Sequence, residues 1–214
     1  MIDTSTSMRG EKWHNLREGL KEFLRKQAHD TDYTLVVFSD TPHLTAQSLD
    51  AANFWKAFTG IKPDGETALY DGFALGLDQI GCLARHRKAV VLLSDGEDNQ
   101  SRNSLATIEQ QVFKTHTTIY AVGILLRKKD GPSTQWRDRQ LLETLARETG
   151  GLSFFPTADT IEQVLSTINA EIAAQYSFGY YANDHATGWK TTTVELTPQL
   201  RDAVLRYPDK YCLK

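Results

Sequence analysis

The stretch from Lys88 to Asp98, which reads KAVVLLSDGED, decides the fold class. After Lys88 it is an uninterrupted apolar run, which is typical of a strand that is buried on both faces of a sheet, and it then turns into an acidic loop. Similar short runs rich in β-branched residues recur along the chain, at residues 33–38 (YTLVVF), 117–122 (TTIYAV) and 152–155 (LSFF). The sequence therefore predicts several short buried strands.

The segments between these runs carry apolar residues at the spacing of an amphipathic helix, as in Trp13, Leu16 and Leu20, or Leu69, Phe73 and Leu77. Buried strands that alternate with such helices predict an α/β fold: a doubly wound, mostly parallel central sheet with helices on both faces. Residues 39–42 read as a turn, and residues 43–47 as an antiparallel edge strand that follows it.

The pattern changes after residue 174. Residues 176–181 and 189–196 read as two strands joined by a polar loop, and the tail at 203–213 reads as a further strand. We therefore expect an α/β domain over residues 1–174 and a short C-terminal β-strand extension over residues 175–214.

Composition excludes several classes of protein. The chain has 214 residues, of which 40% are hydrophobic and 24% charged, as in an ordinary globular protein. Its 24 Lys and Arg against 27 Asp and Glu give a net charge of −3, which argues against a general nucleic-acid binder. No apolar run approaches the ~18 residues of a membrane span, and the first residues lack the pattern of a signal peptide. Cys82 and Cys212 are too few for a disulfide framework or a zinc site, and free thiols are favoured over a pair.

Chemistry-bearing residues recur at the ends of the predicted strands. Asp3, Ser5 and Ser7 alternate directly before the first predicted helix, where they could also serve only as N-capping residues. Asp95 follows the strongest strand, and Thr67 precedes a helix. Because loops that follow parallel strands gather at the carboxyl edge of the sheet, we expect these five side chains to converge there.

The predicted site offers only oxygen ligands, which suit hard cations: Mg²⁺ first, with Mn²⁺ or Ca²⁺ as alternatives. Two carboxylates balance a divalent charge, and the three hydroxyls add none. If one coordination position stays open, the cation can take a carboxylate from outside, which describes an adhesive binding site.

This set of residues resembles the von Willebrand factor A (VWA) family, in which such a motif forms a metal-ion-dependent adhesion site, or MIDAS. Asp3, Ser5 and Ser7 match its D-x-S-x-S motif, Thr67 its threonine and Asp95 its second aspartate. The C-terminal strands are similar to the bacterial VWFA-related domain described in Acidobacteria. The resemblance implies a module that captures an Asp or Glu of a protein partner through the cation, with no enzymatic activity and with an extracytoplasmic or secreted location.

The start of the chain departs from the family, because only Met1 and Ile2 precede Asp3 where the family has a buried apolar strand. A central strand normally pairs on both sides, so we expect unpaired backbone on its neighbours and a less stable chain. Alternatively the tail at 203–213, or a strand exchanged from a second copy, fills the gap, and the second route would make an oligomer.

Two other functions stay open at this stage. One is a Mg²⁺-dependent phosphotransferase or hydrolase with Asp3 as nucleophile, although Ser5 stands where such a site would carry its second Asp. The other is a scaffold whose metal site is vestigial. Glu97 and Asp98 lie one loop away as possible ligand-facing groups, and the scattered histidines lack metal-binding spacing.

Overall fold

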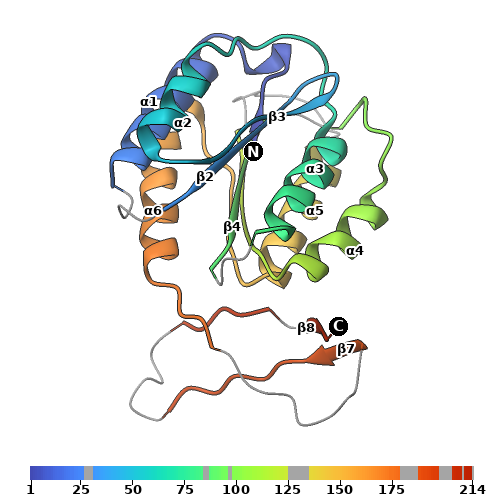
Figure 1. Cartoon of the computed structure of the whole chain (residues 1–214). Helices are drawn as coiled ribbons and strands as arrows, with labels where there is room; N and C mark the ends of the chain where they lie inside the picture. The colour runs from blue at the N-terminus through green and yellow to red at the C-terminus, as the bar shows by residue number, and fades with distance from the viewer. Residues whose placement is uncertain are drawn as a thin grey trace.

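The computed structural model describes residues 1–26, 31–83, 87–95, 98–124, 135–178, 188–197, 204–208 and 210–213 (Figure 1). Its main sheet has six strands in the order β3-β2-β1-β4-β5-β6. All neighbours pair in parallel except β2 and β3, which pair antiparallel, so the expected antiparallel edge strand is confirmed. The strands are β1 (Ile2–Asp3), β2 (Tyr33–Phe38), β3 (Pro42–Leu49), β4 (Ala89–Ser94), β5 (Thr118–Gly123) and β6 (Ser153–Phe154).

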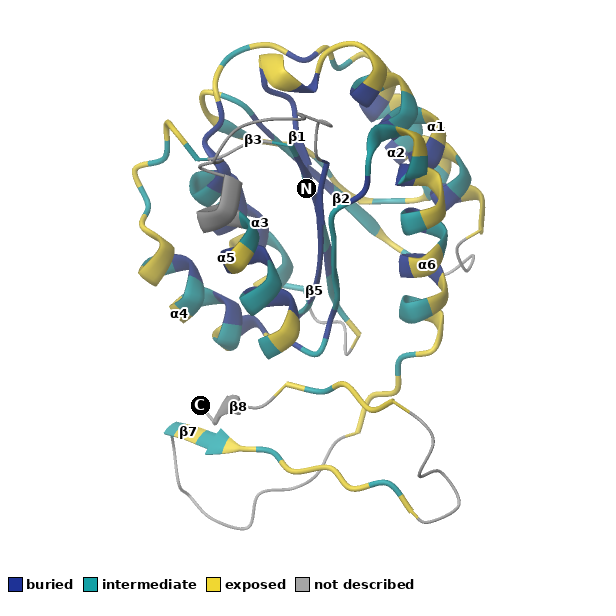
Figure 2. Cartoon of the chain, turned by 180° about the vertical axis from the view of Figure 1, so that it is seen from behind, coloured by how far each residue is buried: buried dark blue, intermediate teal, exposed yellow. Residues whose placement is uncertain are grey.

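Helices cover both faces of this sheet, as the alternation of the sequence predicts (Figures 1 and 2). One face carries α1 (Glu11–Lys26), α2 (Ala51–Thr59) and α6 (Ile161–Ala173), and the other carries α3 (Leu69–Gly81), α4 (Leu105–Thr115) and α5 (Gln135–Glu148). Two single turns of 3-10 helix, η1 (Thr6–Met8) and η2 (Ala158–Thr160), precede α1 and α6. The fold is thus the doubly wound α/β architecture expected.

The central strands β4 and β5 are apolar over most of their length because both of their faces are covered. In β5, Tyr120 and Val122 join the core under α1 and α6, whereas Ile119 and Ala121 join the core under α3 and α5. All four are no more than 1% exposed. Alternating side chains of a strand point to opposite faces, so a strand between two helix layers buries its side chains on both sides, and polar residues such as Asp3 and Ser94 lie at the carboxyl ends of the strands.

The C-terminal residues form a second, two-stranded sheet in which β7 (Gly188–Thr191) pairs antiparallel with β8 (Lys210–Leu213). The predicted strand at 176–181 is wrong over its described part: Tyr176 and Phe178 are 84% and 90% exposed and lie in no strand. Residues 179–181 lie outside the described residues. A β-like pattern forms a strand only where another strand offers an edge to pair with, and β7 and β8 pair with each other.

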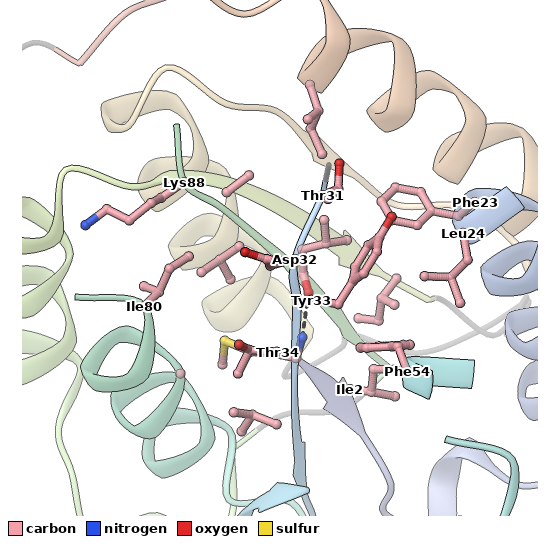
Figure 3. Close-up of a pocket in the computed structure, with 18 of the residues that line it drawn as sticks. Ile2, Phe23, Leu24, Thr31, Asp32, Tyr33, Thr34, Phe54, Ile80 and Lys88 are labelled. Carbon is pink, nitrogen blue, oxygen red and sulfur yellow. Dashed lines mark hydrogen bonds between the residues drawn. The ribbon is translucent and has the colours of Figure 1, made fainter. Parts of the chain in front are cut away.

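Strand β1 is much shorter than its neighbours. It pairs with Val37 and Phe38 of β2 and with Leu93 of β4, so the earlier residues of β2 and β4 face each other without a strand between them. A cavity of about 630 Å³ occupies this position, and Ile2, Leu24, Tyr33, Phe54 and Ile80 are among the residues that line it (Figure 3). The Tyr33 hydroxyl is buried without a hydrogen-bond partner, and burial raises its pKa to about 12.

The cavity lies beside β1, between β2 and β4, and the lower stability expected there stays a prediction. The described part of the tail does not fill it, because β8 pairs with β7 instead, and this corrects one of the two alternatives.

Cys82 is an exposed free thiol. Within the described residues, every helix is either too short or too polar to cross a membrane.

Candidate metal centre

Asp3 ends β1 at the carboxyl edge of the sheet and is fully buried. The backbone N–H of Ser5 donates to its Oδ1 at 2.8 Å, and the Ser94 hydroxyl donates to its Oδ2 at 2.6 Å. Burial raises the pKa of the Asp3 carboxyl above its usual range, although the hydrogen bonds from Ser5 and Ser94 oppose this. Both carboxylate oxygens are therefore held in fixed positions.

A chain of hydrogen bonds joins the D-x-S-x-S motif at residues 3–7 to the loop after β4. The hydroxyls of Ser5 and Ser7 lie 2.9 Å apart, and the Ser7 hydroxyl donates to Asp95 Oδ1 at 2.7 Å. Asp95 directly follows β4, whose Leu93 pairs with β1 in the sheet. The structure thus brings together four of the five predicted side chains, Asp3, Ser5, Ser7 and Asp95, although Asp3 and Asp95 are far apart in sequence.

Thr67, the fifth predicted residue, is buried in the loop before α3. Its backbone N–H donates to Asn99 Oδ1 at 2.9 Å, and its carbonyl accepts from the N–H of Asn99 at 3.0 Å. The neighbouring Gly65 carbonyl accepts from the Thr6 N–H at 2.9 Å. The Thr67 loop is therefore hydrogen-bonded both to the D-x-S-x-S motif at residues 3–7 and to the loop that follows β4.

Lys12 is a member of the site that sequence reasoning missed. Its Nζ forms an ion pair with Asp95 Oδ2 and donates to the Ser7 carbonyl at 3.3 Å. The Lys12 side chain is 7% exposed and the Asp95 side chain 0%. One signal was available, because Lys12 lies four and eight residues before Leu16 and Leu20 and so shares their buried face of α1.

The loop after β4 is anchored by Asp71 in the first turn of α3. The Asp71 carboxylate accepts from the backbone N–H groups of Arg102 and Asn103, at 3.1 and 2.8 Å, and from the Asn103 side chain at 2.8 Å. Partial burial raises the pKa of Asp71, but these hydrogen bonds outweigh it and hold the pKa below its usual range. Asp98 lies in the same loop and accepts from the Tyr70 N–H at 3.2 Å.

The donor chemistry of this site fits a hard cation. Its side-chain groups are carboxylates and hydroxyls, which are the ligands that Mg²⁺, Mn²⁺ and Ca²⁺ prefer. Where the structure describes side chains, no three or more His, Cys, Asp and Glu cluster in a metal-binding arrangement. A cation held here would therefore depend on hydroxyl oxygens as well as on Asp3 and Asp95. The Lys12 ammonium supplies a positive charge at the Asp95 carboxylate.

The family model of the von Willebrand factor type A domain matches residues 1–171. The chain belongs to this family. VWA domains are metal-dependent adhesion and protein-interaction modules, and they are generally not enzymes. The family resemblance drawn from the sequence motifs is confirmed, and the closer resemblance to the domain from Acidobacteria stays a prediction. No curated protein matches the chain in sequence.

Solved VWA structures share the fold. A von Willebrand factor type A protein from Catenulispora acidiphila is 17% identical with a TM-score of 0.64, and the match covers 80% of this chain and 41% of that protein. The proximal thread matrix protein 1 of the mussel byssus, solved with a zinc-occupied MIDAS motif, is 19% identical with a TM-score of 0.60, covering 78% and 44%. An aerotolerance-related membrane protein from Bacteroides fragilis is 14% identical with a TM-score of 0.62, covering 81% and 96%.

The chain spans less than half of the first two of these proteins. At such identities the likeness shows the fold alone.

Proposed function

We propose that this VWA domain binds a divalent cation through Asp3, Ser5, Ser7, Thr67 and Asp95 and uses it to capture an acidic residue of a protein partner. The observation that carries the proposal is the hydrogen-bonded chain from Asp3 through Ser5 and Ser7 to Asp95. It gathers oxygen donors from two strand ends at one edge of the sheet, with the Thr67 loop alongside.

The side-chain charges of the site would not fully neutralise a bound divalent cation. Asp3 and Asp95 supply two negative charges, and the ammonium of Lys12 offsets one of them. The hydroxyls of Ser5, Ser7 and Thr67 are neutral donors. A bound Mg²⁺, or Mn²⁺ or Ca²⁺ in its place, would supply a Lewis-acidic position for an incoming carboxylate, and it would keep excess positive charge to attract one.

The phosphotransferase alternative has one observation in its favour, because such chemistry commonly uses a lysine beside the carboxylates and Lys12 is buried there. Its ammonium pairs with Asp95, however, and Asp3 is held on both oxygens by Ser5 and Ser94. Turnover of p-nitrophenyl phosphate with Mg²⁺, lost in Asp3→Asn, would favour the enzyme over the binding module.

The test of the proposed function is capture of partner proteins by the immobilised domain in Mg²⁺ and, in parallel, in a chelator. We expect proteins retained in Mg²⁺ to be lost in the chelator and lost on Asp3→Ala. Asp78→Ala is the matched control, because Asp78 is exposed on α3, away from the hydrogen bonds of the site. Retention of the same proteins in all four conditions would contradict a cation-dependent contact.

A further inference from the structure

We propose that Lys12 is a built-in counter-ion of this metal centre: it holds Asp95 while no divalent cation is bound, and it lowers the affinity of the site for such a cation. The proposal rests on the proposed function for its second half, whereas its first half concerns the chain without metal. It assigns to the site a residue outside the five oxygen donors.

The position of Lys12 is unusual for a lysine. Lysine side chains are almost never fully buried unless they are paired, because their ammonium loses its hydration. Lys12 lies in the first turn of α1 on the same face as Leu16 and Leu20, which are 0% and 5% exposed. Its stem therefore packs on the core side of the helix, and its ammonium is delivered to the edge of the sheet where the carboxylates lie.

The partners of the ammonium are the groups that a cation would use. Lys12 Nζ contacts Asp95 Oδ2 and the carbonyl of Ser7, while Asp95 Oδ1 accepts from the Ser7 hydroxyl. Every oxygen of the Asp95 carboxylate thus has a partner without a metal. Asp3 is satisfied in the same way by Ser5 and Ser94. Both carboxylates are thus held by residues of the chain itself.

Two effects on the cation follow from this arrangement. The charge of the two carboxylates is reduced from −2 to −1, so a divalent ion is attracted less strongly. The ammonium also lies against the Asp95 carboxylate that would ligate the ion, and two positive charges that share a carboxylate repel each other strongly in a water-poor site. We therefore expect Lys12 to make cation binding weak and sensitive to cation concentration.

The decisive variant is Lys12→Met, which keeps the apolar stem and removes the charge. Lys12→Arg retains the charge, and Lys21→Met is the matched control, because Lys21 is exposed on the same helix. Calorimetric titration with Mn²⁺ and Mg²⁺ at constant ionic strength should show that Lys12→Met binds on the order of tenfold tighter or more than the natural chain. Lys21→Met should stay within about twofold, because the charge of the exposed Lys21 is screened by solvent. Lys12→Arg should not gain the affinity of Lys12→Met, because it keeps the positive charge at position 12. Equal or weaker binding by Lys12→Met would overturn the inference.

A second measurement, thermal unfolding in chelator, tests the counter-ion without any metal. Lys12→Met should melt below the natural chain, because it leaves Asp95 buried without its ion-pair partner. The double variant Lys12→Met/Asp95→Asn, which removes both charges, should recover part of this loss. The same melting temperature in the natural chain and Lys12→Met would overturn the counter-ion role.

These results separate the inference from the proposed function. If the natural chain binds the cation and Asp3→Ala does not, while Lys12→Met gains nothing, the inference fails and the proposed function stands. If no variant binds a cation, the proposed function fails, and the effect of Lys12 on affinity fails with it. In that case a lower melting temperature of Lys12→Met would still assign Lys12 as the structural counter-ion of Asp95.

Discussion

Gly65 shows how a single residue shapes the site. Its φ of +86° lies in the region that side chains disfavour, and a Cβ there would lie 2.6 Å from Asp40 Oδ2. Asp40 Oδ1 accepts from the Glu66 N–H at 2.7 Å, and the Gly65 carbonyl accepts from Thr6. A side chain at position 65 would therefore disturb the hydrogen bond between the Thr67 loop and the D-x-S-x-S motif at residues 3–7.

We expect Gly65→Ala to lower the free energy of unfolding by about 1–3 kcal/mol and to weaken cation binding. Urea denaturation in chelator and a cation titration measure the two effects. Gly60→Ala is the matched control, because Gly60 has a right-handed helical backbone and a Cβ there would meet nothing within 4 Å. Equal stability of the two variants would contradict the role assigned to Gly65.

Between elements, Asp71 links the first turn of α3 to the loop that follows β4. Its lowered pKa means that the charged form is favoured in the folded state, so the stability it contributes is present above the pKa of an unfolded Asp, about 4. That contribution is lost as the pH falls through the lower pKa of the folded chain. The stability of the loop that follows Asp95 should therefore depend on pH in this acidic range.

Asp71→Asn should lower the free energy of unfolding by about 1 kcal/mol near pH 7. The difference from the natural chain should shrink as the pH falls from about 4 through the lower pKa of the folded chain, because Asp71 is protonated first in the unfolded and then in the folded chain. Urea denaturation at a series of pH values measures both. Asp78→Asn on the same helix is the control, and a difference that stays constant down to pH 2 would contradict the assignment.

The cavity beside β1 supports a second prediction about elements. Five apolar residues such as Val-Ile-Val-Leu-Val, added before Met1, should continue β1 between β2 and β4 and pair with both. Each buried backbone group that gains a partner contributes about 1–3 kcal/mol, and the entropy lost in ordering five residues offsets most of this gain. A net gain of about 2–3 kcal/mol should raise the melting temperature by about 5–10 °C. Thermal unfolding measures the rise.

A polar extension of equal length, such as Gly-Ser-Asn-Ser-Gly, is the control for this experiment. Light scattering on the same samples shows whether the chain without the extension forms oligomers, as strand exchange between copies requires. If it does, the apolar extension should yield monomers. Equal melting temperatures in chains that are monomeric throughout would show that the cavity leaves no strand to be gained.

At the scale of the whole molecule, the sequence predicts those helices and strands that are determined by the local pattern of apolar residues. The apolar runs at β4 and β5 and the helical spacing in α1 and α3 are sufficient for the sheet and its two helix layers. The stretch at Tyr176 and Phe178 failed as a strand because pairing depends on which edges remain available, and that is a property of the assembled fold.

The residues of the site also fall into two groups, those that the sequence predicts and those that depend on the folded arrangement. Asp3, Ser5, Ser7 and Asp95 could be predicted because strand ends of a parallel sheet share one edge. Ser94 and Lys12 were missed because their roles depend on side-chain direction across the sheet and on burial in the first turn of α1.

The proposed function requires that this VWA domain hold a divalent cation through Asp3 and its hydrogen-bonded partners. Calorimetric titration of Mg²⁺ and Mn²⁺ into the natural chain, Asp3→Ala and Asp78→Ala measures this binding, with thermal unfolding in chelator to verify that each variant folds. We expect one cation per chain for the natural protein and Asp78→Ala, and no binding by a folded Asp3→Ala. Cation affinity unchanged in Asp3→Ala would contradict it.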